Sequence, residues 1–215
     1  MNIEMPNDSL SPLQSIKRPR NSHLIRVFSI TNRCSLEFYY RAQLSEWTRL
    51  EFDSQIVDFE SINKAFCWEG KSLFVAFRVR YLHSDCFIYI DHSGQDTLVR
   101  AFEDYCSVVG GVCKPLLAET LVGARFEVWN RLKMLSVISR WQNEITSDNI
   151  RRFIAELNGF PFYSLSEIEK LEAFSNGRGH AYAFELVRIG KFRIDSLANE
   201  MITGRTLIKL KPEGV

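Results

Sequence analysis

The sequence predicts an α/β protein: a mixed β-sheet core flanked by helices, followed by a small domain of three helices and a β-hairpin. Apolar residues recur with a helical period in several segments of the chain and alternate in others. The first two thirds of the chain have the order helix, β-meander, helix, strand and helix, which is typical of a layered α/β domain. The chain has 215 residues, 46% of them hydrophobic, which is enough for one large domain or two small ones.

The first predicted helix covers about residues 35–50. Four apolar side chains at spacings of four, four and three share one face of this helix: Leu36, Tyr40, Leu44 and Trp47. Glu37 lies beside the apolar stripe near the expected helix start. An acid is stabilised there by the helix dipole alone, so its position has a purely structural explanation.

A β-meander is predicted next, because three β-rich runs follow one another with tight polar turns between them. After a short strand within residues 52–59, the runs cover residues 64–68, 73–82 and 86–91. A second helix over about residues 97–109 ends at the Gly110-Gly111 pair. A strand at 112–117 and a helix at about 125–141 complete this part of the chain.

The C-terminal part is predicted to hold three helices and a hairpin. The helices cover about residues 148–157, 164–174 and 180–189, and the strands cover 190–195 and 206–210. Ser164 and Glu167 have the spacing of a capping box, which favours a helix start at that point. Three helices followed by a β-hairpin resemble the winged-helix layout.

We therefore expect three parts: a flexible tail at 1–24, an α/β domain at 25–142 and a winged-helix-like domain at 143–215. The tail is polar, with three prolines and a small basic cluster. It has no basic start followed by an apolar stretch, as a secretory signal would, and no apolar run is long enough for a membrane span. These features predict a cytoplasmic protein.

The net charge of +1 gives the chain no overall basic field, so contacts with DNA must come from local clusters or from a partner protein. The five cysteines are odd in number and scattered, which predicts reduced and mostly buried thiols. His83, Cys86 and His92 lie close in sequence but lack a matching second ligand pair. The chain has no P-loop, dinucleotide signature, nucleophile elbow or paired zinc motif.

Several segments in order resemble the TnsA family of transposase endonuclease subunits. Residues 35–37 read SLE, 51–60 read EFDSQIVDFE, 74–81 read FVAFRVRY and 88–93 read IYIDHS. Further on, 115–120 read PLLAET, 129–140 read WNRLKMLSVISR, 180–195 read HAYAFELVRIGKFRID and 206–208 read TLI. The resemblance covers residues 33–210, and it implies a restriction-endonuclease-like core followed by a small helical domain.

In such a nuclease, the acids hold Mg²⁺, which activates water beside the scissile phosphate, and a lysine two residues after a strand acid stabilises charge. The resemblance places Glu37 as the helix acid and Asp91 as the second strand acid. Ala76 stands at the position of the first strand acid and Ser93 at that of the lysine. Because two of these four positions are lost, we expect impaired or absent cleavage, with Mg²⁺ as cofactor only if the protein is active.

Three functions remain open. The resemblance implies a subunit of a heteromeric transposase, whose partners are an integrase-type transposase, an AAA+ regulator and the DNA of the transposon ends. The second is a stand-alone DNA-binding or regulatory protein on an inert nuclease-like scaffold. The third is an active nuclease rebuilt around Glu37, Asp85 and Asp91, although Asp91 before Ser93-Gly94 also fits a turn initiator.

Five basic residues are candidates for contact with DNA. Arg178 and His180 open the third C-terminal helix, Arg188 lies near its end, and Lys191 and Arg193 lie on the predicted hairpin. In a winged helix such side chains contact phosphates. The alternative is a protein-docking domain with ordinary surface charges, which the near-neutral net charge favours.

Overall fold

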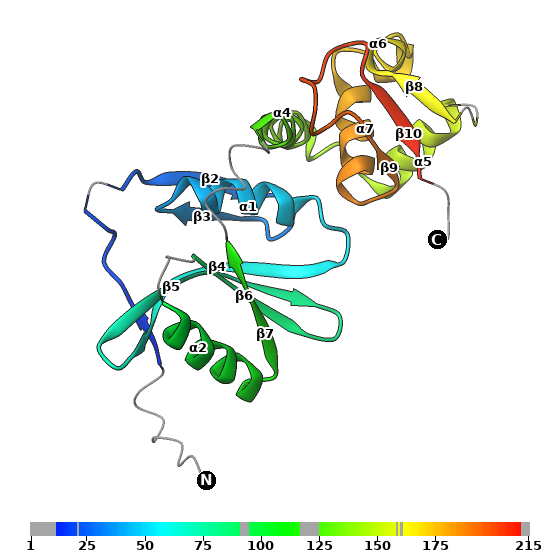
Figure 1. The fold of residues 1–215 in the computed structure, drawn as a ribbon. Coiled ribbons are helices and arrows are strands. Elements are labelled where there is room, and N and C mark those ends of the chain that lie inside the picture. The colour runs from blue at the N-terminus through cyan, green and yellow to red at the C-terminus, as the bar shows by residue number, and fades with distance from the viewer. Residues whose placement is uncertain are drawn as a thin grey trace. The chain divides into compact units, whose positions relative to one another are not determined.

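The computed structural model describes residues 12–20, 22–90, 95–116, 125–157, 159 and 161–211. The chain divides into two compact units (Figure 1). The first comprises Met1–Leu44 and Gln55–Glu119, and the second comprises Ser45–Ser54 and Thr120–Val215.

A five-stranded mixed sheet forms the centre of the first unit, as the sequence predicts. Its strands in spatial order are β1 (Leu13–Ser15), β4 (Ile56–Trp68), β5 (Lys71–Tyr81), β6 (Asp85–Ile90) and β7 (Gly111–Leu116). Neighbouring strands are antiparallel except for β6 and β7, which are parallel. The predicted meander is therefore confirmed, while β1 lies within the segment expected to be a flexible tail.

Helix α2 (Asp96–Val108) connects β6 to β7 and packs on one face of the sheet (Figure 1). A crossover of this kind is what allows two consecutive strands to run parallel. Phe102 is fully buried, and its ring lies 5.6 Å from that of Tyr89 and 5.0 Å from that of Phe66. The helix ends at Gly110, whose φ of +77° suits a residue without a side chain.

A two-stranded ribbon lies on the other face of the sheet and consists of β2 (Ile25–Ser29) and β3 (Cys34–Phe38). Helix α1 (Arg41–Glu51) follows the ribbon in the chain, and only its first turn belongs to the first unit. The first part of the predicted helix 35–50 is therefore wrong. Leu36 and Phe38 are buried on alternate positions of a strand, and the Phe38 ring packs 5.6 Å from that of Phe77. Leu36 fits the predicted helical stripe, but Leu36 and Phe38 also fit one face of a strand, and residues 34–38 pair with β2.

The second unit contains helices around a small antiparallel sheet. Its elements are α4 (Arg125–Trp141), α5 (Ser147–Glu156), β8 (Phe162–Ser164), α6 (Leu165–Ile168), the 3₁₀ helix η1 (Glu172–Phe174), α7 (Arg178–Arg188), β9 (Phe192–Arg193) and β10 (Leu207–Leu210). The strands lie in the order β8, β10, β9. Helix α7 is the centre of this unit, because Phe153 and Phe174 pack on its Tyr182 with ring centroids 5.6 Å and 5.3 Å away.

The predicted boundary at residue 143 differs from the observed division, since α4 packs against α7 and belongs to the second unit.

The predicted helix 164–174 is interrupted, because the N–H groups of Lys170 and Leu171 bond to carbonyls three residues back. Thr146 caps α5, because its side chain accepts a hydrogen bond from the N–H of Asn149. Strand β8 is an element that the sequence did not reveal.

Candidate functional site

The position expected for the first strand acid of a nuclease lies inside the hydrophobic core. Ala76 is fully buried on β5, at a bulge where Val75 pairs with Tyr89 while Phe77 pairs with Ile88. A β-bulge of this kind re-aims side chains and is frequent beside active sites. Here, however, the methyl group of Ala76 offers no ligand. Asp91 and Ser93 lie outside the described residues.

The side chain of Glu37 does not point toward Ala76. It lies on strand β3 rather than on a helix, and its carboxylate accepts a hydrogen bond of 2.9 Å from Nε of Arg26 on β2. Side chains alternate along a strand, and Phe38 packs toward β5 through Phe77. Glu37 therefore points to the opposite face of the β2–β3 ribbon, with 45% of its side chain exposed. The prediction of a helix acid in a shared pocket is wrong for this residue.

A pair of amides occupies the region level with Ala76. In the pairing of β4 with β5, Ser61 lies opposite Phe77 and Lys64 opposite Val75, so Asn63 belongs to the bulge facing Ala76. Gln43, from the first turn of α1, is fully buried, and its Nε2 donates to Oδ1 of Asn63 over 2.8 Å.

Each polar side-chain atom of this amide pair has a partner. Oε1 of Gln43 accepts from the backbone N–H groups of Tyr39 at 2.9 Å and Tyr40 at 3.2 Å. Nδ2 of Asn63 donates to the Glu37 carbonyl over 2.8 Å. Asn63 has a φ of +48°, which asparagine tolerates better than most residues. Gln43 was missed from the sequence alone, although a buried polar residue three positions into a helix can bond back to the preceding backbone.

The amide pair offers no carboxylate to a metal ion. Neutral amides supply no negative charge for Mg²⁺, which prefers carboxylates and water. Within the described parts of the chain, no group of three His, Cys, Asp or Glu side chains is placed to hold a metal ion. Asp85 does not replace the missing acid: it accepts hydrogen bonds of 2.8 Å and 2.5 Å from Arg78, and it lies three residues before Ile88 on β6, about 10 Å along the strand.

A ladder of ion pairs crosses the sheet beside a shallow hollow of about 400 Å³. Asp58 pairs with Arg80, and Arg78 contacts both Glu60, at 3.7 Å, and Asp85. The hydrogen bond from Arg78 to Asp85 raises the pKa of Arg78. Lys64, which also lines the hollow, balances the third acid, so this surface carries no charge excess that would select an ionic ligand.

The cysteines are free thiols, as expected, but only Cys86 and Cys106 of the five are buried. Cys106 is hydrogen-bonded to Cys113, which raises the pKa of Cys106 and lowers that of Cys113. His92 lies outside the described residues. Among the described residues, His83 and Cys86 belong to no group of three side chains that could hold a metal ion.

Three of the five predicted DNA contacts are engaged inside the second unit. Arg188 forms hydrogen bonds of 2.7 Å and 2.8 Å with Glu185, and only 15% of its side chain is exposed. Nε2 of His180 lies 2.8 Å from the Leu165 carbonyl oxygen. Arg178 pairs with Glu144 at 3.3 Å and stacks over a tryptophan ring on α4. From Gly179 to Leu186, α7 is buried apart from the half-buried His180, so this helix offers little surface to a groove of DNA.

The other two predicted residues lie together on the outer face of the small sheet. Lys209 pairs across the strands with Arg193, and the N–H of Lys211 donates to the Lys191 carbonyl over 2.9 Å. Phe192 is buried, so its neighbours point outward, Arg193 on β9 and Lys191 directly before it. Lys209 and Lys211 were missed from the sequence, although the alternation in residues 206–211 could have placed both on one face.

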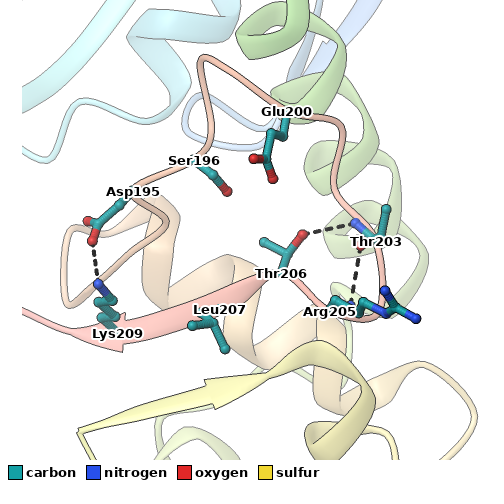
Figure 2. A pocket seen from close by; sticks show the side chains of 8 residues that line it. All are labelled: Asp195, Ser196, Glu200, Thr203, Arg205, Thr206, Leu207 and Lys209. Carbon is teal, nitrogen blue, oxygen red and sulfur yellow. Dashed lines mark hydrogen bonds and ion pairs between the residues drawn. The ribbon is translucent and has the colours of Figure 1, made fainter.

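A hollow of about 280 Å³ adjoins this face, between β10 and the loop that follows β9 (Figure 2). Ser196 and Glu200 point into it from the loop, and Thr206 lies at its floor (Figure 2). At its edge, Lys209 donates a hydrogen bond of 2.6 Å to Asp195, which lowers the pKa of that carboxyl.

Comparison with known proteins gives the chain no family. No family model matches its sequence, and no curated protein matches it. Among the helices in the described residues, none is both long and apolar enough to cross a membrane.

Proposed function

We propose that this chain is a TnsA-like subunit of a heteromeric DNA transposase, which acts in transposon end processing or transpososome assembly with lost or impaired nuclease activity. The order of elements in the first unit supports the ancestry. The first turn of α1, the meander β4–β5–β6, helix α2 and the parallel strand β7 follow one another in this unit, whose centre is a mixed sheet. The same order of elements was predicted from the sequence for the α/β core.

The observation that carries the loss of cleavage is the neutral cluster level with Ala76. A nuclease needs acids at this part of the sheet to hold a metal ion. The bound metal ion contributes several kcal/mol to transition-state stabilisation. Here a buried Gln43 and Asn63 satisfy each other and the adjacent backbone. Such a closed network stabilises the fold and offers no charged ligand to a metal.

We further propose that the second unit is winged-helix-like. Support comes from the order α5, β8, α6, α7, β9, β10 and from the sheet order β8, β10, β9, in which the last strand lies between the other two. The burial of α7 favours docking of a protein over insertion of this helix into DNA. The integrase-type transposase and the AAA+ regulator are the proposed protein partners.

Nicking assays test the catalytic part of the proposal. Purified protein is incubated with Mg²⁺ and a duplex that carries a transposon end, beside a family member that keeps all three acids and the lysine. We expect a rate at least about 1000-fold below that of the active relative, since roughly 4 kcal/mol of stabilisation is lost. Mg²⁺-dependent nicking at a comparable rate would show that a rebuilt nuclease is the better description.

Binding assays test the assembly part. Size-exclusion chromatography with the integrase-type transposase encoded beside the chain is expected to give a stable complex. If neither this transposase nor an ATPase encoded nearby binds, while the chain alone occupies a specific DNA site, the alternative of a stand-alone regulatory protein replaces the proposal.

A further inference from the structure

We propose that the outer face of the β8–β10–β9 sheet binds single-stranded DNA. The face is defined by the outward side chains of the three strands and their flanks: Phe162, Leu207, Lys209, Lys211, Lys191, Arg193 and Asp195. This inference deepens the proposed function, on which its role in transposition rests, by naming the surface and the state of the DNA.

The charge of the outer face points to a polyanion. Lys209 lies directly opposite Arg193, and Lys211 lies beside Lys191. Like charges facing one another across two strands destabilise a sheet. Asp195 is the single carboxylate among the seven residues, bonded to Lys209 at 2.6 Å and to Arg193 at 3.3 Å. Four cations against one acid leave an excess that a row of phosphates would neutralise.

The cations remain accessible despite the pairing with Asp195. Arg193 exposes 55% of its side chain and Lys209 exposes 37%. Lys191 and Lys211 are also exposed. Along each strand the two cations are two residues apart, about 7 Å, so they can contact different phosphates of one backbone.

An exposed ring in the same row favours unpaired bases. Phe162 lies opposite Lys209 on the side away from Arg193, and 54% of its surface is exposed. Leu207, two residues along β10, is also 43% exposed. An aromatic ring set beside cations on an open sheet is a stacking platform for a base of a single strand. A base pair within a duplex does not present its flat face to such a ring.

The adjacent hollow gives a second reason to prefer a single strand. Its lining combines hydroxyl groups with the Glu200 carboxylate, and Ser196 and Glu200 both point into it (Figure 2). Hydroxyls and carboxylates can bond the edges of a base, and only an unpaired base can leave the strand to reach them. Lys209 stands at the rim, between this hollow and the ring of Phe162.

Fluorescence anisotropy with the full chain tests the proposal. Labelled oligothymidylate is compared with a duplex of the same length at several salt concentrations. We expect the single strand to bind more tightly, with a slope of log affinity against log salt of about −2 to −3 for three or four phosphate contacts. The double variant Lys191→Ala, Lys211→Ala is expected to reduce that slope by about 1.4.

Phe162→Ala separates stacking from charge. It is expected to weaken oligothymidylate binding roughly 5- to 100-fold and to leave duplex binding unchanged. Phe126→Ala is the matched control, because Phe126 is similarly exposed, at 43%, but lies on α4. The double variant Arg151→Ala, Arg152→Ala removes two exposed cations from α5 and controls for net charge.

Equal binding of duplex and single strand with no effect of Phe162→Ala would overturn the proposal in favour of plain backbone contact. Binding of polyglutamate but not of DNA would overturn it in favour of an acidic protein segment. These measurements use the chain without partners and without Mg²⁺. Their failure therefore leaves the nicking and complex-formation tests of the proposed function intact.

Discussion

At the scale of single residues, the first unit contains a pair of hydrogen-bonded amides, Gln43 and Asn63. A buried carboxylate without a cation or metal is costly, whereas an amide is tolerated when its donors and acceptors are satisfied. Gln43 and Asn63 meet this condition with partners at 2.8 Å to 3.2 Å. The two residues thus act as a polar clasp between helix α1 and strand β4.

Gln43→Ala is expected to lower the free energy of unfolding by roughly 1–3 kcal/mol. The substitution leaves two backbone N–H groups and the Oδ1 atom of Asn63 without their partner. Urea denaturation measures the change. Gln14→Ala, on the exposed side of β1, is the matched control and is expected to stay within about 0.5 kcal/mol of the unmodified protein. An equal effect of both substitutions would argue against the clasp.

The carboxylate of Glu167 makes the stability of the fold depend on pH. Hydrogen bonds from the backbone and hydroxyl of Ser164 lower its pKa. A lowered pKa in the folded state adds stability above the unfolded value of about 4.3, and this stability disappears as pH falls through the folded pKa.

The melting temperature of the unmodified protein should exceed that of Glu167→Gln at pH 7. The difference should shrink as the pH falls from about 4.5 toward 3. Differential scanning calorimetry at several pH values provides the measurement. A difference that grows toward low pH would mean that folding raises the pKa of Glu167 instead of lowering it.

At the scale of elements, helix α4 holds the loop between β9 and β10. The side chain of Asn130, fully buried, donates to the carbonyls of Leu197 at 2.8 Å and Glu200 at 2.6 Å and accepts from the N–H of Ile202 at 2.9 Å. Lys133 adds a bond of 3.0 Å to the Ile202 carbonyl. The loop beside the hollow is thereby fixed chiefly by one asparagine on a neighbouring helix.

Asn130→Ala is therefore expected to destabilise the second unit by roughly 2–3 kcal/mol, since buried backbone groups of the loop lose their partner. Hydrogen exchange should accelerate at the Ile202 amide, because this N–H bonds to the asparagine side chain. The neighbouring Asn199→Ala, at an exposed position of the same loop, controls for the loss of an amide. Unchanged protection at Ile202 would show that the loop is held by other contacts.

Much of the element order could be predicted from the sequence. Helix α4 and the capping box at Ser164 and Glu167 follow from periodicity and local hydrogen-bonding chemistry, which depend on neighbouring residues only. Strands β3 and β8 do not, because each is defined by pairing with a strand elsewhere in the chain. Short strands without a periodic signal are set by such tertiary contacts rather than by propensity.

The candidate site was predicted less well for a similar reason. Placing Glu37 on a helix put its carboxylate on the wrong face of the wrong element, since one change of secondary structure redirects every side chain in the segment. The role of Gln43 depends on Asn63, twenty residues away at a bulge. Lys191 and Arg193 were predicted to lie on the hairpin, but the positions of Lys209 and Lys211 beside them required the strand register.

At the scale of the whole molecule, each unit contains its own aromatic core. In the first, Phe102 packs with Phe66 and Tyr89 between α2 and the sheet. In the second, Phe153 and Tyr182 stack with ring centroids 5.6 Å apart. Separate cores of this kind can unfold as separate cooperative units, each with its own stability.

Phe102→Ala and Phe153→Ala test this independence, because both remove a fully buried ring and each is expected to cost roughly 3–5 kcal/mol. Hydrogen exchange followed by mass spectrometry should show lost protection in β4 to β7 for the first variant, with α5 and α7 unchanged. The second variant should give the reverse pattern. If either substitution exposes both regions equally, the two units unfold as one cooperative body, and changes made in the small sheet could not be interpreted separately from those made in the first unit.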